Sequence, residues 1–71
     1  MAIAGTEWIE SFAAQLGVGA PDTATIELLL ELAGVAAHSS ERIAAPIACW
    51  LVGSAGIDPA RALSLARGIG I

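Results

Sequence analysis

Apolar residues recur at helical spacing in four stretches of this chain, and glycine or proline separates the stretches. In the first stretch the apolar positions lie three or four residues apart, as on one face of a helix. These positions are Trp8, Ile9, Phe12, Ala13 and Leu16. Because Thr6 is a suitable N-cap and Gly17 a suitable stop, we predict a helix over residues 7–16.

The second stretch is apolar around most of its circumference. Asp22 or Thr23 can cap a helix over residues 23–39, in which only Glu27 and Glu31 form a polar strip. A helix with so little polar surface is normally central in its fold or covered by a partner.

Proline sets the start of the last two helices. Pro46 suits a first helical turn and predicts a helix over residues 45–55. The pair Asp58-Pro59 is a start signal for a helix over residues 59–68. The expected inward faces are Ile47, Trp50, Leu51 and Ser54 in the third helix, and Ala62, Leu65, Ala66 and Ile69 in the fourth.

No stretch shows the two-residue alternation of a β-strand. We therefore predict an all-α fold, a compact bundle of about four short helices, with residues 1–71 forming a single domain. Trp8 and Trp50 are expected to pack in its core, because large aromatic side chains dominate cores. The alternative is that they are partner-binding anchors, since tryptophan is enriched among the residues that dominate interfaces.

The composition predicts association. Hydrophobic residues make up 56% of the chain and charged residues 14%, against about 45–50% and about 25% in ordinary domains. So small a domain has too high a surface-to-volume ratio to hide this apolar surface. We expect a protein partner or a homo-oligomer, through an interface that includes Leu28, Leu32, Val35, Cys49 and Val52.

The charge balance narrows the class of partner. Seven acidic residues against three arginines give a net charge of −4. Nucleic acids and anionic membranes attract clustered cations, so neither is expected as a partner. No apolar run is long enough to cross a bilayer and the first residues carry no positive charge, so we expect a cytoplasmic protein.

No motif indicates catalysis, a cofactor or a metal. His38 adjoins Ser39 and Ser40, but neighbouring residues at a helix end point in different directions, which is unsuitable for a nucleophile and its base. Cys49 lies in an apolar context without a nearby cation, as a buried and unreactive cysteine does. We expect the chain not to be an enzyme.

A polar cluster ahead of the third helix supports two interpretations. His38, Ser39 and Arg42 can hold a phosphate or carboxylate near the positive end of that helix. Alternatively, the polar groups satisfy the helix ends, and Arg42 pairs with Glu41 or Glu31. The structural interpretation is favoured, and the ligand site stays open as the alternative.

From about residue 7 to residue 66 the chain resembles a small helical domain of uncharacterised function. The similarity lies in Glu7-Trp8, Leu16-Gly17, residues 28–53 and Asp58, and is most specific at Ala37-His38, Arg42, Ala45-Pro46 and Leu51-Val52-Gly53. That domain occurs as a stand-alone protein and as a C-terminal extension of molybdenum cofactor guanylyltransferase. The glycine-rich loop and metal-binding aspartates of the nucleotidyltransferase itself are absent from this chain.

The resemblance implies an accessory role in molybdenum cofactor maturation or beside a molybdoenzyme, by association rather than by mechanism. We therefore expect a non-catalytic interaction module with a molybdenum cofactor enzyme as partner. The alternatives are a domain that binds a small anionic ligand, such as a phosphate-bearing nucleotide cofactor, and a self-assembling structural subunit.

Overall fold

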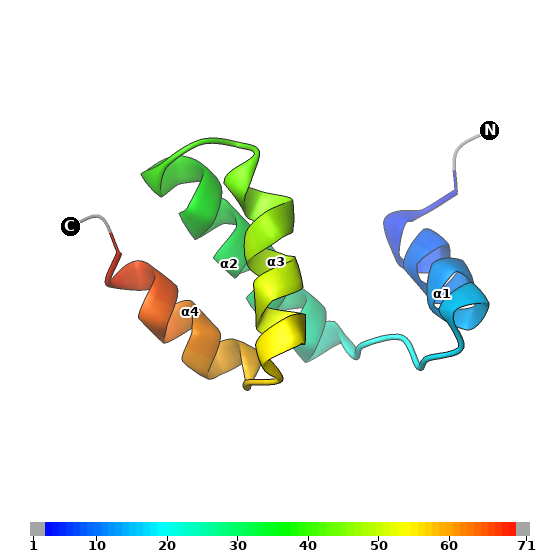
Figure 1. The fold of residues 1–71 in the computed structure, drawn as a ribbon. Helices are drawn as coiled ribbons and strands as arrows, with labels where there is room; N and C mark the ends of the chain where they lie inside the picture. Colours follow the sequence, from blue (N-terminus) through cyan, green and yellow to red (C-terminus); the bar gives the residue numbers. More distant parts are fainter. Residues whose placement is uncertain (1–2, 70–71) are drawn as a thin grey trace.

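The structure is a computed structural model that describes residues 3–69, and over that range it contains four helices and no strand (Figure 1). The helices are α1 (Gly5–Leu16), α2 (Thr23–Ser39), α3 (Ala44–Ala55) and α4 (Pro59–Arg67). The predicted all-α class and the four helices are confirmed.

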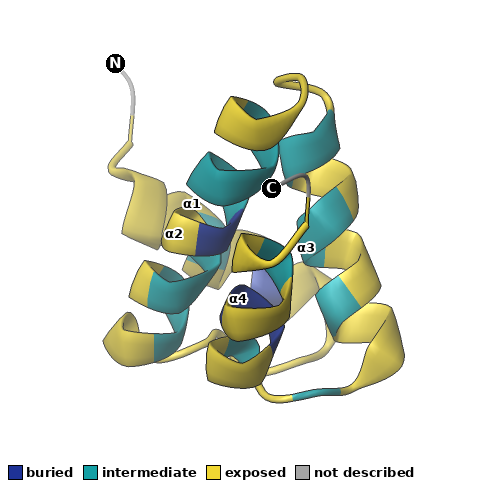
Figure 2. Cartoon of the chain, turned by 90° about the vertical axis from the view of Figure 1, so that its left-hand side faces the viewer, coloured by how far each residue is buried: buried dark blue, intermediate teal, exposed yellow. Residues whose placement is uncertain are grey.

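Helix α2 is the centre of the fold, because both α3 and α4 pack against it. Its Leu32 is only 3% exposed, and the side chains of Ala62 and Leu63 on α4 are buried as well. Figure 2 shows how few positions are buried, since most of each helix is exposed or half-buried. The body of the fold is therefore three helices around a small core.

Helix α1 stands to one side of this body (Figure 1). Its contact region is the start of α2, where Ile9, Pro21 and Ile26 help to line a hollow of about 340 Å³. The radius of gyration is 12.9 Å, larger than the roughly 11 Å expected for 71 residues in a compact domain. The excess reflects the displaced α1.

Short side chains and glycine set the helix ends. An Asp22 Oδ1 accepts a hydrogen bond from the Thr25 amide at 2.8 Å and so caps α2. Gly17 and Gly56 end α1 and α3 with φ of 79° and 68°, a left-handed conformation that glycine adopts without strain.

Two of the predicted helix starts differ from the structure. Helix α1 begins at Gly5 after an Ala4 N-cap, so the expectation that Thr6 caps it was wrong. Helix α3 begins at Ala44, one residue earlier than expected, after a turn in which the Ala44 amide donates to the Glu41 carbonyl at 2.9 Å.

The expected inward face of α3 was also wrong. Ile47, Trp50 and Leu51 are exposed, Trp50 by 68%, whereas the smaller Cys49 and the other short side chains are half-buried. The Cys49 Sγ lies 3.9 Å from the Leu29 carbonyl oxygen of α2. Small side chains let two helices approach closely, which explains why this face packs on α2.

The expectation that both tryptophans are core residues was wrong as well. Trp8 is 55% exposed and Trp50 is 68% exposed. On α4 the expected core residue Ala62 is buried, whereas Leu65 and Ile69 are exposed and Leu63 is buried in their place. Most of the large apolar side chains expected inside these helices thus face solvent in the single chain.

The cap of α2 should make stability depend on pH. Hydrogen bonding from Thr25, through its side chain and then its backbone amide, lowers the pKa of Asp22 below its ordinary 3.8. A lowered pKa in the folded state stabilises the fold above the unfolded value, and this contribution is lost as pH falls through the folded value. Thermal melts between pH 7 and pH 2 should therefore show Asp22→Ala less stable than wild type at neutral pH and equal to it at the acid end. Asp22→Asn is the control, because asparagine can cap the helix without ionising. If this variant lost stability at low pH as much as the wild type does, the pH dependence could not come from Asp22.

Leu32 should be the most sensitive apolar position in the body. Leu32→Ala should cost about 2–5 kcal/mol in the free energy of unfolding, because it removes methyl groups from the α2 crossing. Leu30→Ala on the same helix is the matched control, since Leu30 is 66% exposed and should change stability by less than about 0.5 kcal/mol. Urea denaturation measures both, and equal losses would refute the core described here.

Candidate functional site

Exposed apolar side chains are the main surface feature of residues 3–69. Twelve large apolar residues are exposed: Ile3, Trp8, Phe12, Leu16, Val18, Leu30, Ile43, Ile47, Trp50, Leu51, Leu65 and Ile69. Scattered exposed apolar residues are ordinary, but contiguous patches mark interaction surfaces. Three such surfaces lie on this chain.

The first surface is an apolar groove between α3 and α4, with a volume of about 250 Å³. Leu51 stands on its α3 side, Leu65 and Ile69 on its α4 side, and Leu32 of α2 also lines it. We call it the α3–α4 groove. Its lining is apolar throughout, so a ligand would be held by burial of apolar surface and not by ion pairs.

The second surface is the outer side of α3. Ile43, Ile47 and Trp50 follow one another at intervals of four and three residues, so they share one helix face, and all three are exposed. We call these three residues the α3 ridge. Ile43 and Ile47 also border a shallow hollow of about 470 Å³ with Ser40 and Glu41.

The third surface is one face of α1. Trp8, Phe12 and Leu16 recur every four residues and are all exposed, and we call them the α1 stripe. The Trp8 and Phe12 ring centroids are 5.1 Å apart with the planes tilted by 32°, a favourable arrangement for two aromatic rings. This contact fixes the two rings as one apolar unit.

The residues expected at a partner interface lie deeper than these surfaces. Leu32 is buried, and Leu28, Val35, Cys49 and Val52 are half-buried. Helices α2 and α3 are apolar on most sides, so the spacing of apolar residues along the sequence does not specify which face of each helix meets its neighbour. The exposed positions of the same helices are the ones that can meet a partner without rearrangement.

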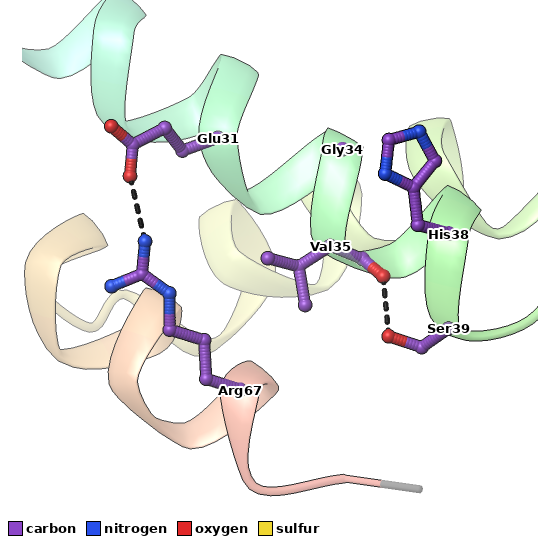
Figure 3. Close-up of a pocket in the computed structure, with 6 residues that line it drawn as sticks. All are labelled: Glu31, Gly34, Val35, His38, Ser39 and Arg67. Carbon is purple, nitrogen blue, oxygen red and sulfur yellow. Dashed lines mark hydrogen bonds and ion pairs between the residues drawn. The ribbon is translucent and has the colours of Figure 1, made fainter.

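The polar cluster of the sequence lies beside a hollow of about 540 Å³ between α2 and α4 (Figure 3). His38 and Ser39 line it together with Glu31, Gly34, Val35 and Arg67. The Arg67 Nη2 contacts the Glu31 Oε2 at 3.0 Å, and the Ser39 hydroxyl donates to the Val35 carbonyl at 2.6 Å. Figure 3 shows the His38 ring at the opposite end of the hollow from the Arg67 guanidinium.

Arg42 does not line this hollow, so the structure does not bring together the three expected ligand residues. The expected pairing of Arg42 with Glu31 was wrong, because Glu31 pairs with Arg67 of α4. Among residues 3–69, neither the His38 ring nor the Arg42 guanidinium makes a hydrogen bond. Sequence reasoning missed Arg67, since a contact between residues 36 positions apart leaves no local signal.

The serines behave as the structural interpretation expected. Besides Ser39, the Ser40 hydroxyl donates to the Ala36 carbonyl at 2.7 Å. Both hydroxyls therefore bond to backbone carbonyls one turn back at the end of α2, and the Ala36 carbonyl also accepts from the Ser40 amide at 3.2 Å. This use leaves their protons unavailable to an anion.

The described residues offer little for metal chemistry. No group of three or more histidine, cysteine, aspartate or glutamate side chains gathers within residues 3–69. Within the same range, each helix is too short or too polar to cross a bilayer. Arg67, which lines the hollow between α2 and α4, already has a carboxylate partner in Glu31.

The Glu31–Arg67 pair should contribute little to stability. Both side chains are 59% exposed, and exposed pairs contribute less than about 1 kcal/mol. A double-mutant cycle with Glu31→Gln and Arg67→Gln, measured by urea denaturation at low and high salt, should give a coupling below that value that falls with salt. A coupling well above it, independent of salt, would show that the pair is shielded from solvent.

Comparison with known proteins identifies the family. The family model described as "Domain of unknown function (DUF6457)" matches residues 3–68, which is nearly the whole chain. No curated protein and no solved structure matches the chain significantly. The match includes all four helices, the α1 stripe, the α3 ridge and the residues of the α3–α4 groove except Ile69. On this match the chain belongs to the DUF6457 family.

Proposed function

We propose that this domain is a non-catalytic interaction module that binds a partner protein through the α3 ridge. The observation that carries the proposal is the row of Ile43, Ile47 and Trp50, which are exposed on one side of α3 from its N-cap, Ile43, onward. Leaving such side chains in water is unfavourable, and a partner that covers them recovers this free energy.

The chemistry of α3 supports a protein as the ligand. The helix carries no charged residue along its twelve positions. The centres of protein interfaces are depleted in charge, and tryptophan is enriched among the residues that dominate binding. A helix face with anchors at these intervals suits an apolar groove on the partner.

The proposed partner is an enzyme of molybdenum cofactor maturation or a molybdoenzyme. The support is the resemblance of the chain to a domain attached to molybdenum cofactor guanylyltransferase, because fused domains commonly act on the same process. The domain would then bind the enzyme in trans where the two are separate chains. The apolar α3 ridge gives this association a physical basis.

A second candidate function is the binding of a small anion in the hollow between α2 and α4. The observation in its favour is that His38 and Arg67 line one hollow. Against it, Glu31 neutralises Arg67 and the Ser39 hydroxyl is already used by the backbone. An anion would have to displace the Glu31 carboxylate, so the interaction module is the better supported function.

The α3 ridge should be required for partner binding but not for folding. Trp50→Ser should leave the free energy of unfolding within about 0.5 kcal/mol of wild type, since the residue is exposed. It should weaken binding to purified molybdenum cofactor guanylyltransferase about 30-fold or more, as loss of a dominant interface residue does. Isothermal titration and thermal melting measure the two quantities.

Leu30→Ser is the matched control, because Leu30 is similarly exposed and lies on α2 rather than α3. It should bind as wild type does. Affinity capture from native cells with the same three proteins extends the test to other partners. If Trp50→Ser binds every partner as well as Leu30→Ser does, the proposed binding through the α3 ridge is refuted. Saturable binding of GTP by the wild type that is lost in Arg67→Gln would favour the anion site instead.

A further inference from the structure

We propose that α1 of one chain docks in the α3–α4 groove of a second copy, so that two chains exchange α1 helices in a symmetric dimer. The proposal joins two apolar surfaces that lie unpaired on the same chain. It does not rest on the proposed function, because it uses the α1 stripe and the α3–α4 groove and leaves the α3 ridge free.

Helix α1 is built to present its apolar stripe outward. Its other apolar face contains Ile9, which is half-buried, and Ala13, which is buried. Ile9 borders the hollow at the start of α2, so this face holds α1 to its own chain. Trp8 and Phe12 then remain exposed as a paired aromatic unit.

The dimensions of stripe and groove agree. With a rise of 1.5 Å per residue, Trp8 to Leu16 extends over about 12 Å of helix. The α4 side of the groove, from Ala62 to Ile69, extends over roughly 10 Å at the same rise. A helix laid along the groove would therefore bring the whole α1 stripe against apolar walls.

The helix that occupies the α3–α4 groove comes from a second copy, because α1 of the same chain lies on the far side of the body from α4. Figure 1 shows α2 and α3 lying between α1 and α4. To reach its own groove, α1 would have to leave its place beside the start of α2, where Ile9 and Ile26 line one hollow. A second chain needs no such change.

Charge favours the same pairing. Helix α1 carries Glu7 and Glu10 and no basic residue, whereas α4 carries Arg61 and Arg67 and no acidic residue. Arg67 already pairs with Glu31 of its own chain, so Arg61 is the α4 cation that can meet the acidic helix. Each chain has a net charge of −4, so two copies repel each other in general. Placing an acidic helix beside a basic one offsets this repulsion over the roughly 8–10 Å at which charges still interact in salt.

The exchange is closed only in a two-fold arrangement. A two-fold axis that places α1 of each copy over the groove of the other makes the two contacts identical, so that assembly ends at two chains, whereas a head-to-tail contact would continue into larger assemblies of higher mass. Both contacts bury aromatic and leucine side chains that are exposed in the single chain. The dimer thus covers two of the three apolar surfaces at once.

The test is the mass of the full chain by sedimentation equilibrium. Wild type should be a dimer at micromolar concentration. Trp8→Ser/Phe12→Ser, which removes the stripe, and Leu65→Ser, which breaks the groove wall, should each raise the dimer dissociation constant at least tenfold. Leu30→Ser is the control and should remain dimeric, and circular dichroism should show unchanged helix content in all variants.

Mixing the two defective proteins gives the decisive result. The stripe variant keeps an intact groove and the groove variant keeps an intact α1, so a mixture can form one complete contact. It should yield a heterodimer that neither variant forms alone as a homodimer. A tag on one variant and native mass spectrometry identify the heterodimer.

Three results would overturn the proposal. They are a monomeric wild type at all concentrations, a dimer that both variants preserve, and a mixture that forms no heterodimer. A Trp50→Phe background leaves Trp8 as the fluorescent tryptophan: a blue-shifted Trp8 emission in the monomer would mean that α1 docks in its own chain. Partner binding through Trp50 is measured separately, so either proposal can fail while the other holds.

Discussion

The contact of Leu32 with its neighbours at the middle of α2 is the interaction on which the rest of the fold depends. Helices α3 and α4 both pack against α2, and the few buried side chains of the body gather there. Three helices of nine to seventeen residues enclose little volume, so the core of the body is filled by Leu32 of α2 with Ala62 and Leu63 of α4. The other large apolar side chains of residues 3–69 are half-buried or exposed.

This shortage of interior explains the surface of the protein. On α3 the short side chains face α2, because they allow the two helices to approach, and the bulky ones are left outward. The result is a helix whose outer face, with Trp50 and Ile47, is as apolar as a protein core. Covering part of this surface with another protein removes apolar side chains from water and so stabilises the chain.

The polar groups around the hollow are satisfied in part, by the backbone of α2 and by one ion pair. The hydroxyls of Ser39 and Ser40 bond to carbonyls one turn back along α2, and Arg67 pairs with Glu31 across the helix packing. Serine hydroxyls near a helix end commonly bond to a backbone carbonyl one turn back, and here they do so. This use of the polar groups supports the proposal that the domain binds through its apolar surfaces.

The sequence by itself determined the helices. Gly17, Asp22 and the pair Asp58-Pro59 act through their own backbone geometry, so their effect is local, and the four elements are found where this punctuation predicts them. Only the tertiary structure decided how each helix is rotated. Helices α2 and α3 are apolar nearly all round, so periodicity offered no preferred inward face, and the outcome was set by which side chains let the helices approach. The same holds for Arg67, whose carboxylate partner lies 36 residues away and is selected by the packing of α4 on α2.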